Sequence, residues 1–214
     1  MSYLRTFLPW IVYAVLAGHT ASAQQRGTVA ALVVTVLVIA YKVRKEHSTF
    51  EALIIETGSA VFFAAMAIVA FAVPHSGALT YAAALSSTTL AAIAWGSLAA
   101  RHPFTLGIAK QSTPPEVWSQ PAFAHSNVVI TTIWAASMTV SALILLVVIH
   151  AGGDVLVRMV FQILGFVVPM LGTRRYVKMV HARAHAAAGY PPAGAHVRSL
   201  SAREGNGAVG PAVR

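Results

Sequence analysis

The stretch from Thr57 to Ala100 reads TGSAVFFAAMAIVAFAVPHSGALTYAAALSSTTLAAIAWGSLAA and contains no Lys, Arg, Asp or Glu. It is interrupted only near its middle, by Pro74-His75-Ser76-Gly77. Two apolar runs of about 20 residues joined by a tight turn rich in Pro and Gly are typical of paired membrane-spanning helices. Because lipid offers no hydrogen-bond partner to the backbone, only helices and closed barrels cross a membrane. The stretch therefore predicts a helical hairpin within a bilayer.

The composition of the whole chain indicates the same environment. Its 214 residues are 57% hydrophobic and 10% charged, and the mean hydropathy of +0.70 lies outside the range of soluble globular domains. The formal charge of +9 comes from basic residues that cluster at the ends of apolar runs. That placement is typical of membrane topology signals and not of nucleic-acid binding. Cysteine is absent, which excludes disulfides, thiolate catalysis and cysteine metal centres.

Six apolar segments are candidates for membrane spans. They cover residues 7–18, 27–41, 53–73, 78–100, 128–149 and 155–172. We therefore expect an all-α fold, namely a polytopic membrane helix bundle with five or six transmembrane helices within residues 1–188. The second segment is short, and we expect Lys42, Arg44 and Lys45 to extend toward the headgroups and lengthen its reach. No segment shows the alternating polar pattern of a membrane barrel.

The first apolar segment has several interpretations. Arg5, the run 7–17 and the small residues Ala21-Ser22-Ala23 together resemble a cleavable secretory signal. Pro9 and Trp10 at the front of the run instead favour a segment that stays in the mature protein. Its length fits an interfacial or re-entrant helix as well as a short span. We expect the segment to be retained, and the sequence leaves open whether it crosses.

The distribution of basic residues predicts an orientation. If all six segments cross from a cytoplasmic N-terminus, 13 of the 15 Lys and Arg residues lie inside, and only Arg26 and Arg158 lie outside. The loops 41–49 and 101–126 stay cytoplasmic even if the first segment does not cross. This bias predicts a multi-pass membrane protein with a cytoplasmic C-terminus. Residues 189–214 lack apolar periodicity and predict a disordered basic tail beside anionic lipid.

Glu56 is the ionisable residue that stands out among the apolar segments, because it follows Ile54-Ile55 a few residues inside the third one. An ionisable group at membrane depth is a functional hypothesis by default, since keeping it charged there is costly. Glu56 is therefore a candidate intramembrane ionisable site. In the interpretation that we favour, Glu56 pairs with Lys42, Arg44 or Arg101 and anchors the helices at the membrane interface.

The remaining polar residues form no recognisable catalytic motif. His150 and Asp154 flank one turn, but two ligands are too few for a metal site. The other histidines are scattered, and neither a P-loop nor a dinucleotide-binding glycine fingerprint is present. We therefore expect no cofactor, no metal and no enzymatic activity. Small residues on both arms of the central hairpin, such as Gly58 and Ala82, predict closely packed helices.

The loop 101–126 is expected to be the most structured part outside the spans. Its prolines stop helices and fix extended turns. The aromatic side chains of Trp118, Phe123 and Trp134 suit the membrane interface, where an amphipathic ring is favoured. We interpret the loop as a segment that lies along the inner leaflet and offers a docking surface to a partner.

A motif in this region matches a known family. A basic residue and a proline at a helix end are followed by Pro-x-x-Trp, and then by an Asn and a Trp at the start of the next span. The matching residues are Arg101, Pro103, Pro115, Trp118, Asn127 and Trp134. With these residues, and with the order of apolar segments over residues 5–180, the chain resembles the bacterial inner-membrane family called intracellular septation protein A, as a divergent relative.

The resemblance implies a non-enzymatic membrane protein that acts in septation, cell division and maintenance of the cell envelope. Its expected partners are the lipid bilayer, anionic lipids at the cytoplasmic face and other membrane proteins of the envelope or division machinery. Self-association is compatible with this picture, and nucleic acid is not expected. The alternative is a small proton-coupled transporter or carrier that uses Glu56. We place it second, because the sequence shows no inverted repeats with matching broken helices.

Overall fold

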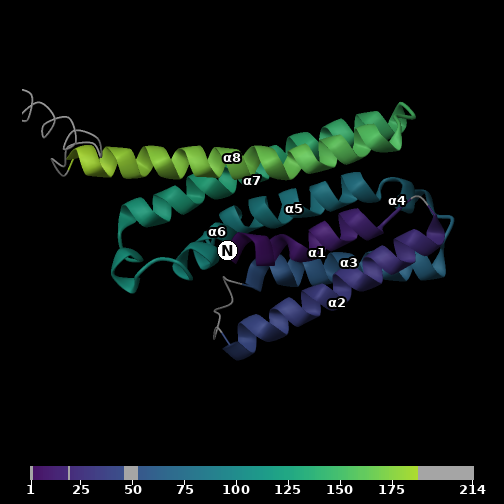
Figure 1. Ribbon diagram of the computed structural model, residues 1–214, viewed down its shortest axis with the longest axis horizontal. Helices are drawn as coiled ribbons and strands as arrows, with labels where there is room; N and C mark the ends of the chain where they lie inside the picture. Colours follow the sequence, from purple (N-terminus) through teal and green to yellow (C-terminus); the bar gives the residue numbers. More distant parts are fainter. Residues whose placement is uncertain (1, 19, 46–52, 188–214) are drawn as a thin grey trace, which may run out of the picture. The chain divides into compact units, whose positions relative to one another are not determined.

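The structure is a computed structural model that describes residues 2–18, 20–45 and 53–187 (Figure 1). Within these residues the chain is helical and contains no strand. The expected tail, residues 189–214, lies outside the described residues, as do His19 and the connection 46–52. The elements are α1 (Ser2–Leu16), α2 (Ala21–Lys45), α3 (Ile54–Ala72), α4 (Gly77–Thr80), α5 (Ala82–Ala99), α6 (Phe104–Lys110), the 3-10 turn η2 (Pro115–Val117), α7 (Pro121–His150) and α8 (Val155–Ala187).

Five of these helices are long and apolar enough to cross a membrane, namely α2, α3, α5, α7 and α8. The helix α1 is also apolar but shorter. The prediction of an all-α membrane bundle is therefore confirmed, and the chain is a multi-pass membrane protein. Contacts divide it into two units, residues 1–172 and 173–214. The packing described below concerns the first unit, and the described part of the second is the C-terminal end of α8.

The helix α2 is longer than the apolar segment that predicts it. It begins at Ala21 and includes the polar residues Gln24 and Gln25. The amide Nε2 of Gln24 donates to the carbonyl of Gly18 at 2.8 Å, and that of Gln25 donates to the carbonyl of Ala70 at 3.0 Å. These amides satisfy carbonyl oxygens near the ends of α1 and α3, so the polar residues belong to the fold. Apolarity alone could not indicate this.

The two helices of the central hairpin are α3 and α5, and the connection between them contains one extra helical element, α4. The hydroxyl of Ser76 accepts a hydrogen bond from the backbone nitrogen of Ala78 at 3.2 Å and so caps the single turn α4. The helix α5 follows at Ala82 and packs most extensively against α7. The helices α1, α2 and α3 form a second set of close neighbours. Figure 1 shows α1 running between these two sets.

Aromatic side chains of α1 hold the two sets together. Trp10 lies 5.1 Å from Phe62 and 4.8 Å from Phe63 of α3, measured between ring centroids. About one helical turn earlier in α1, Phe7 stacks on Trp134 of α7 at 4.7 Å with an interplanar angle of 5°. Stacked and tilted rings at these separations stabilise a core beyond the area that they bury. The helix α1 is thus part of the core of the first unit.

The position of Trp134 corrects the sequence analysis. We expected its ring at the lipid interface, but it is 5% exposed and is enclosed by Phe7 and by Phe104 of α6. The physical reason is that α1 and α6 both pack against this part of α7. A tryptophan ring suits either an interface or an aromatic core, and only the neighbouring helices decide between them.

The turn between α1 and α2 depends on a glycine. A Cβ atom at Gly27 would lie 2.7 Å from the backbone nitrogen and the Cα atom of Ala17. Because these are backbone atoms, they cannot rotate away. We expect Gly27→Ala to lower the free energy of unfolding by about 1–3 kcal/mol, as overpacking does. The measurement is the denaturation of the detergent-solubilised protein followed by circular dichroism.

Gly96→Ala is the matched control, because it is the same substitution within a helix that leaves room for it. No atom lies within 4 Å of a Cβ atom at Gly96, so we expect equal or slightly higher stability there. Equal losses for the two variants would contradict the close approach of α1 and α2.

Candidate functional site

A buried ion pair joins three helices at one end of the first unit. Lys42 lies in the last turn of α2, and Glu56 lies in the first turn of α3. The ammonium nitrogen Nζ of Lys42 is 2.5 Å from Oε1 of Glu56, and each side chain is only 1% exposed. The same Nζ donates to Oγ1 of Thr6 in α1 at 3.2 Å. The cluster therefore ties α1, α2 and α3 together.

The direction of the Lys42 side chain corrects an expectation. We expected Lys42, like Arg44 and Lys45, to extend toward the headgroups, but Lys42 is buried and turns inward, whereas Arg44 and Lys45 are exposed. The reason is the carboxylate of Glu56. A buried charge without a partner costs several kcal/mol, and an ammonium group at hydrogen-bond distance offsets that cost.

The backbone favours the same arrangement of charges. The cation Lys42 lies at the C-terminus of α2, and the anion Glu56 lies at the N-terminus of α3. Each charge therefore complements the partial charge of its own helix end. Of the three cations offered as partners of Glu56, the structure brings Lys42 to it. No sequence pattern indicated Thr6, because only the tertiary fold brings α1 beside the end of α2.

Access to the pair is closed. A cavity of about 690 Å³ in the first unit is lined by neither Lys42 nor Glu56. The Glu56 carboxylate accepts from the ammonium group of Lys42, and both side chains are 1% exposed, so the pair has little capacity to bind a further ligand. In this arrangement the pair acts as a connection between helices.

The residues of the predicted docking motif fall into two groups. Pro103 precedes α6, whose residues Phe104 and Thr105 are buried. The hydroxyl of Thr105 donates to the backbone carbonyl of Asn127 at 2.9 Å, and lies 2.7 Å from the hydroxyl of Thr131. These contacts seat α6 on α7. Pro103, Asn127 and Trp134 thus gather around α6, while Arg101, Pro115 and Trp118 lie on the exposed side.

Asn127 carries an unusual feature. Its side chain is buried, and its Nδ2 atom donates to the carbonyl of Phe123 at 2.9 Å. Its Oδ1 atom is buried too, yet no residue in the described part of the chain donates to it. A buried acceptor without a donor costs about 1–3 kcal/mol. The presence of an unsatisfied acceptor at this buried position is therefore not explained by its contribution to stability.

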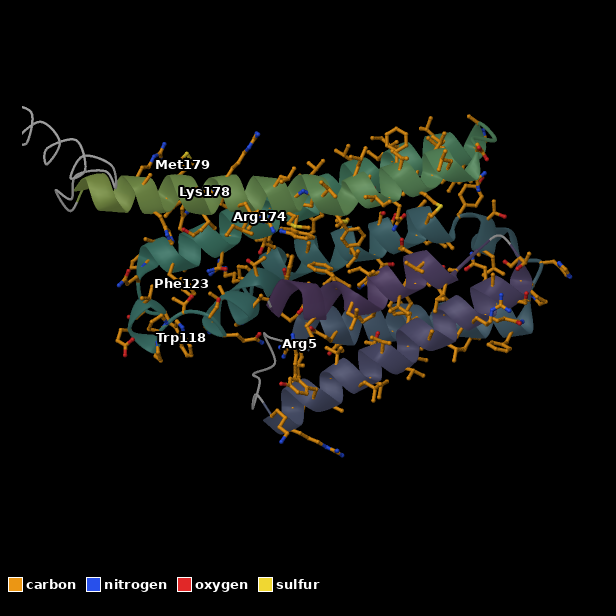
Figure 2. The ribbon with its side chains drawn as sticks, in the orientation of Figure 1. Arg5, Trp118, Phe123, Arg174, Lys178 and Met179 are labelled. Carbon is orange, nitrogen blue, oxygen red and sulfur yellow. The ribbon has the colours of Figure 1, made fainter. Side chains whose placement is uncertain are left out.

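The exposed group is held in a defined shape. The indole nitrogen of Trp118 donates to the backbone carbonyl of Thr113 at 3.0 Å, and the ammonium group of Lys110 lies 5.7 Å from the centre of its ring. The ring nevertheless remains 39% exposed. Figure 2 shows Trp118 and Phe123 at the connection between α6 and α7. This connection, residues 111–120, therefore exposes the aromatic ring of Trp118 next to α6, which packs against α7.

Arg101 adopts a backbone conformation that favours glycine. Its φ angle is 60°, and the turn closes with hydrogen bonds from Arg101 to the carbonyl of Leu98 at 3.0 Å and from His102 to that of Ser97 at 2.9 Å. This is a Schellman turn, whose left-handed position is usually a glycine. The helix α7 ends in the same turn with Gly152 at a φ of 71°.

Comparisons of the chain with known protein families, with curated proteins and with solved structures found no match. Within the residues that the structure describes, no three His, Asp or Glu side chains lie close enough together to hold a metal ion.

The ion pair leads to a double-mutant prediction. Lys42→Met and Glu56→Gln each leave one buried group without its partner, and we expect each to lower the free energy of unfolding by about 3–5 kcal/mol. The double variant should lose clearly less than the sum, because no unpaired charge remains. The measurement is equilibrium denaturation in detergent.

Arg44→Gln serves as the control, since it removes an exposed cation from the same helix turn and should change stability by about 0.5 kcal/mol or less. Additive losses in the double variant would contradict a direct pairing of the two side chains.

Proposed function

We propose that this chain is a non-enzymatic protein of a bacterial inner membrane that acts by binding other membrane proteins of the cell envelope. The proposal includes a role in septation and envelope maintenance, which the resemblance to intracellular septation protein A implies. The face that binds is the exposed group around Arg101, Pro115 and Trp118. In the proposed orientation this face, and the C-terminus, lie in the cytoplasm.

The backbone of Arg101 carries the proposal. An L-residue in the left-handed region costs about 1–2 kcal/mol relative to a glycine-compatible position, and α7 shows that the same turn is built with glycine in this chain. The guanidinium group of Arg101 is exposed and makes no hydrogen bond or ion pair with any residue of the described chain. Two backbone hydrogen bonds close the turn, but no contact of the Arg101 side chain within the described chain offsets the cost. A strained exposed residue is a reason to infer a function.

An exposed ring in the segment between α5 and α7, which begins at Ala100 and includes Arg101, supports a binding face. Trp118 supplies an exposed aromatic ring, and Arg and Trp are the residues that most often dominate the energy of protein interfaces. Both lie on segments that α6 supports through its buried contacts with α7. A preformed face loses little conformational entropy when a partner binds. This arrangement supports recognition of a partner better than it supports a reaction.

A single substitution separates stability from binding. Arg101→Gly should raise the free energy of unfolding by about 1 kcal/mol, because it removes the left-handed penalty. The same variant should no longer bind the partner protein. The measurement combines denaturation in detergent with cell-based photo-crosslinking from a reactive amino acid at position 118, read as crosslinked species on a gel.

A crosslinker at the exposed Trp95 of α5 provides the control, since that ring lies outside the proposed face. Gly152→Ala, at the equivalent turn of α7, should lower stability and leave the crosslinks unchanged. If Arg101→Gly keeps every crosslink from position 118, the proposed face is wrong.

The second candidate function is proton-coupled transport through Glu56. The observation that favours it is a carboxylate that is 1% exposed within a membrane bundle, because such groups are frequent in proton pathways. Transport would require Lys42 to separate from Glu56 during each cycle. The double variant with Lys42→Met and Glu56→Gln tests this in proteoliposomes, because it should fold yet carry no proton. Uptake driven by a pH gradient in the parent chain, lost in that variant, would favour transport over the scaffold role.

A further inference from the structure

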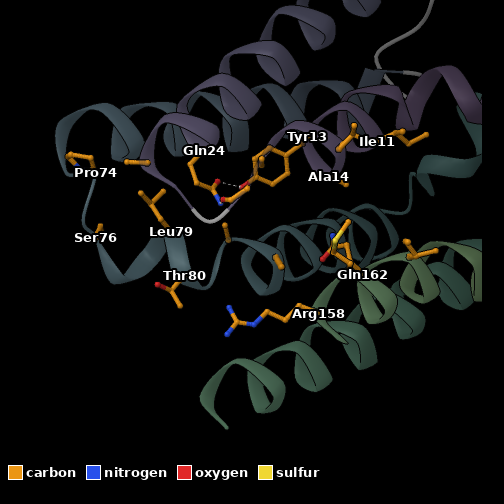
Figure 3. Close-up of a pocket in the computed structure, with 18 of the residues that line it drawn as sticks. Ile11, Tyr13, Ala14, Gln24, Pro74, Ser76, Leu79, Thr80, Arg158 and Gln162 are labelled. Atoms are coloured by element: carbon orange, nitrogen blue, oxygen red, sulfur yellow. Dashed lines mark hydrogen bonds between the residues drawn. The ribbon is translucent and has the colours of Figure 1, made fainter. Parts of the chain in front are cut away.

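A large cavity lies at the end of the first unit opposite the ion pair. It has a volume of about 690 Å³ and is formed by α1, the turn after it with the start of α2, the connection between α3 and α4, α4 with the start of α5, and the first turns of α8 (Figure 3). A volume of 300–1,000 Å³ is usual for sites that bind small molecules. All of its lining residues belong to residues 1–172, which form one unit.

The cavity exists because small side chains face it. Ala14, Ala17 and Gly18 line it from α1 and the following turn, and Ala82 and Ala83 line it from α5. Elsewhere in the chain such residues let helices approach closely, as at Gly27. Here no neighbouring helix fills the space. The small residues therefore make an apolar hollow.

The hollow is open to the surroundings of the helices. Its lining includes Val15 of α1, which is 74% exposed, and Ile163 of α8, which is 56% exposed. In a membrane-spanning bundle, exposed apolar side chains of this kind face lipid chains. A hydrocarbon chain of the bilayer can thus enter the cavity sideways, past an apolar rim.

Among the described residues, one Arg or Lys lines the cavity, namely Arg158, and Asp154 lies four residues before it. Arg158 of α8 donates from its Nε atom to the backbone carbonyl of Gly153 at 2.9 Å, which fixes the direction of the guanidinium group. Its terminal nitrogens have no partner among residues 2–18, 20–45 and 53–187. No Asp or Glu of the described chain lines the cavity. Figure 3 shows Arg158 and Thr80 at the same side of the hollow.

The position of Arg158 in the chain is also unusual. It is one of the two cations that the charge bias leaves on the outer side, so the positive-inside rule does not account for it. A charged residue within a membrane segment is a functional hypothesis by default. Arg158 lies just after the turn between α7 and α8, near the start of the candidate span Leu156–Arg183.

A second polar group lies one helical turn further. The amide Nε2 of Gln162 donates to the hydroxyl oxygen of Ser86 at 3.0 Å. The single hydroxyl hydrogen of Ser86 is already used, because it is donated to the carbonyl of Ala83 at 2.7 Å. This fixes the orientation of the amide. The Oε1 atom of Gln162 is then a buried acceptor for which no described residue supplies a donor.

We propose that the cavity binds one anionic glycerophospholipid from the surrounding leaflet. Its phosphodiester pairs with the guanidinium group of Arg158, and one acyl chain lies along the apolar lining. A free phosphate would use the cation and leave the apolar lining without a partner, whereas a lipid uses both. The inference does not depend on the proposed partner-binding function.

The test uses the full chain purified in a neutral detergent. Dioleoyl phosphatidylglycerol or dioleoyl phosphatidylcholine is added, and the lipid-bound fraction is measured by native mass spectrometry. We expect phosphatidylglycerol to bind in preference to phosphatidylcholine. Arg158→Gln should weaken phosphatidylglycerol binding about tenfold, which corresponds to the loss of one charge-assisted hydrogen-bonded pair.

Arg26→Gln is the matched control. It removes the other cation of the same end, which is exposed and does not line the cavity, so phosphatidylglycerol binding should not change. If the two variants weaken binding equally, the lipid is attracted by net charge alone and the proposed site is wrong. If phosphatidylcholine binds as well as phosphatidylglycerol, the role of Arg158 is wrong.

Two further arms keep the proposal testable if Arg158→Gln does not fold. Ala14→Phe places a ring in the hollow from the exposed side of α1 and should also abolish phosphatidylglycerol binding. Glycerol 3-phosphate, a headgroup without chains, should not displace the lipid. Unchanged binding by Ala14→Phe, or displacement by glycerol 3-phosphate at equal concentration, would overturn the lipid site.

Discussion

Neither Lys42 nor Glu56 could stay buried and charged at its position without the other. Taking two charges out of water costs more than most single contacts return, and the cost is tolerated only when the charges meet each other and the remaining hydrogen-bonding positions are used. The hydroxyl of Thr6 accepts one further hydrogen bond from Lys42. The pair therefore requires α1, α2 and α3 to converge at one end of the bundle.

The helix α1 links this constraint to the rest of the first unit. One of its faces places Thr6 beside the ion pair, and its rings Phe7 and Trp10 contact α7 and α3 respectively. The helix is shorter than the five candidate spans, yet it contributes side chains to both sets of helices. Further along α1 its residues become small, and the packing gives way to the cavity. One short helix thus supports a tightly packed end and an open end.

The two ends of the first unit differ in chemistry. The end with the ion pair also contains the exposed Arg101 and Trp118, and the contacts there are between protein groups. The opposite end holds an apolar cavity with Arg158 as its cation. Protein recognition requires a preformed polar and aromatic face, whereas lipid recognition requires a hydrocarbon-lined hollow beside a charge. The two proposals thus concern separate surfaces, and a substitution at one end should leave the other end unchanged.

The sequence by itself determined the helical class, the five spans and the candidate partners of Glu56, because the free energy of placing a segment in lipid is a sum over its own residues. It did not determine which side of each helix faces inward. In a soluble protein the hydrophobic face reveals this, but lipid is as apolar as a protein core, so the pattern carries little such information. Only the tertiary structure decided that Trp134 and Lys42 turn inward and that the alanines near Arg158 leave a cavity, because each depends on which helices become neighbours.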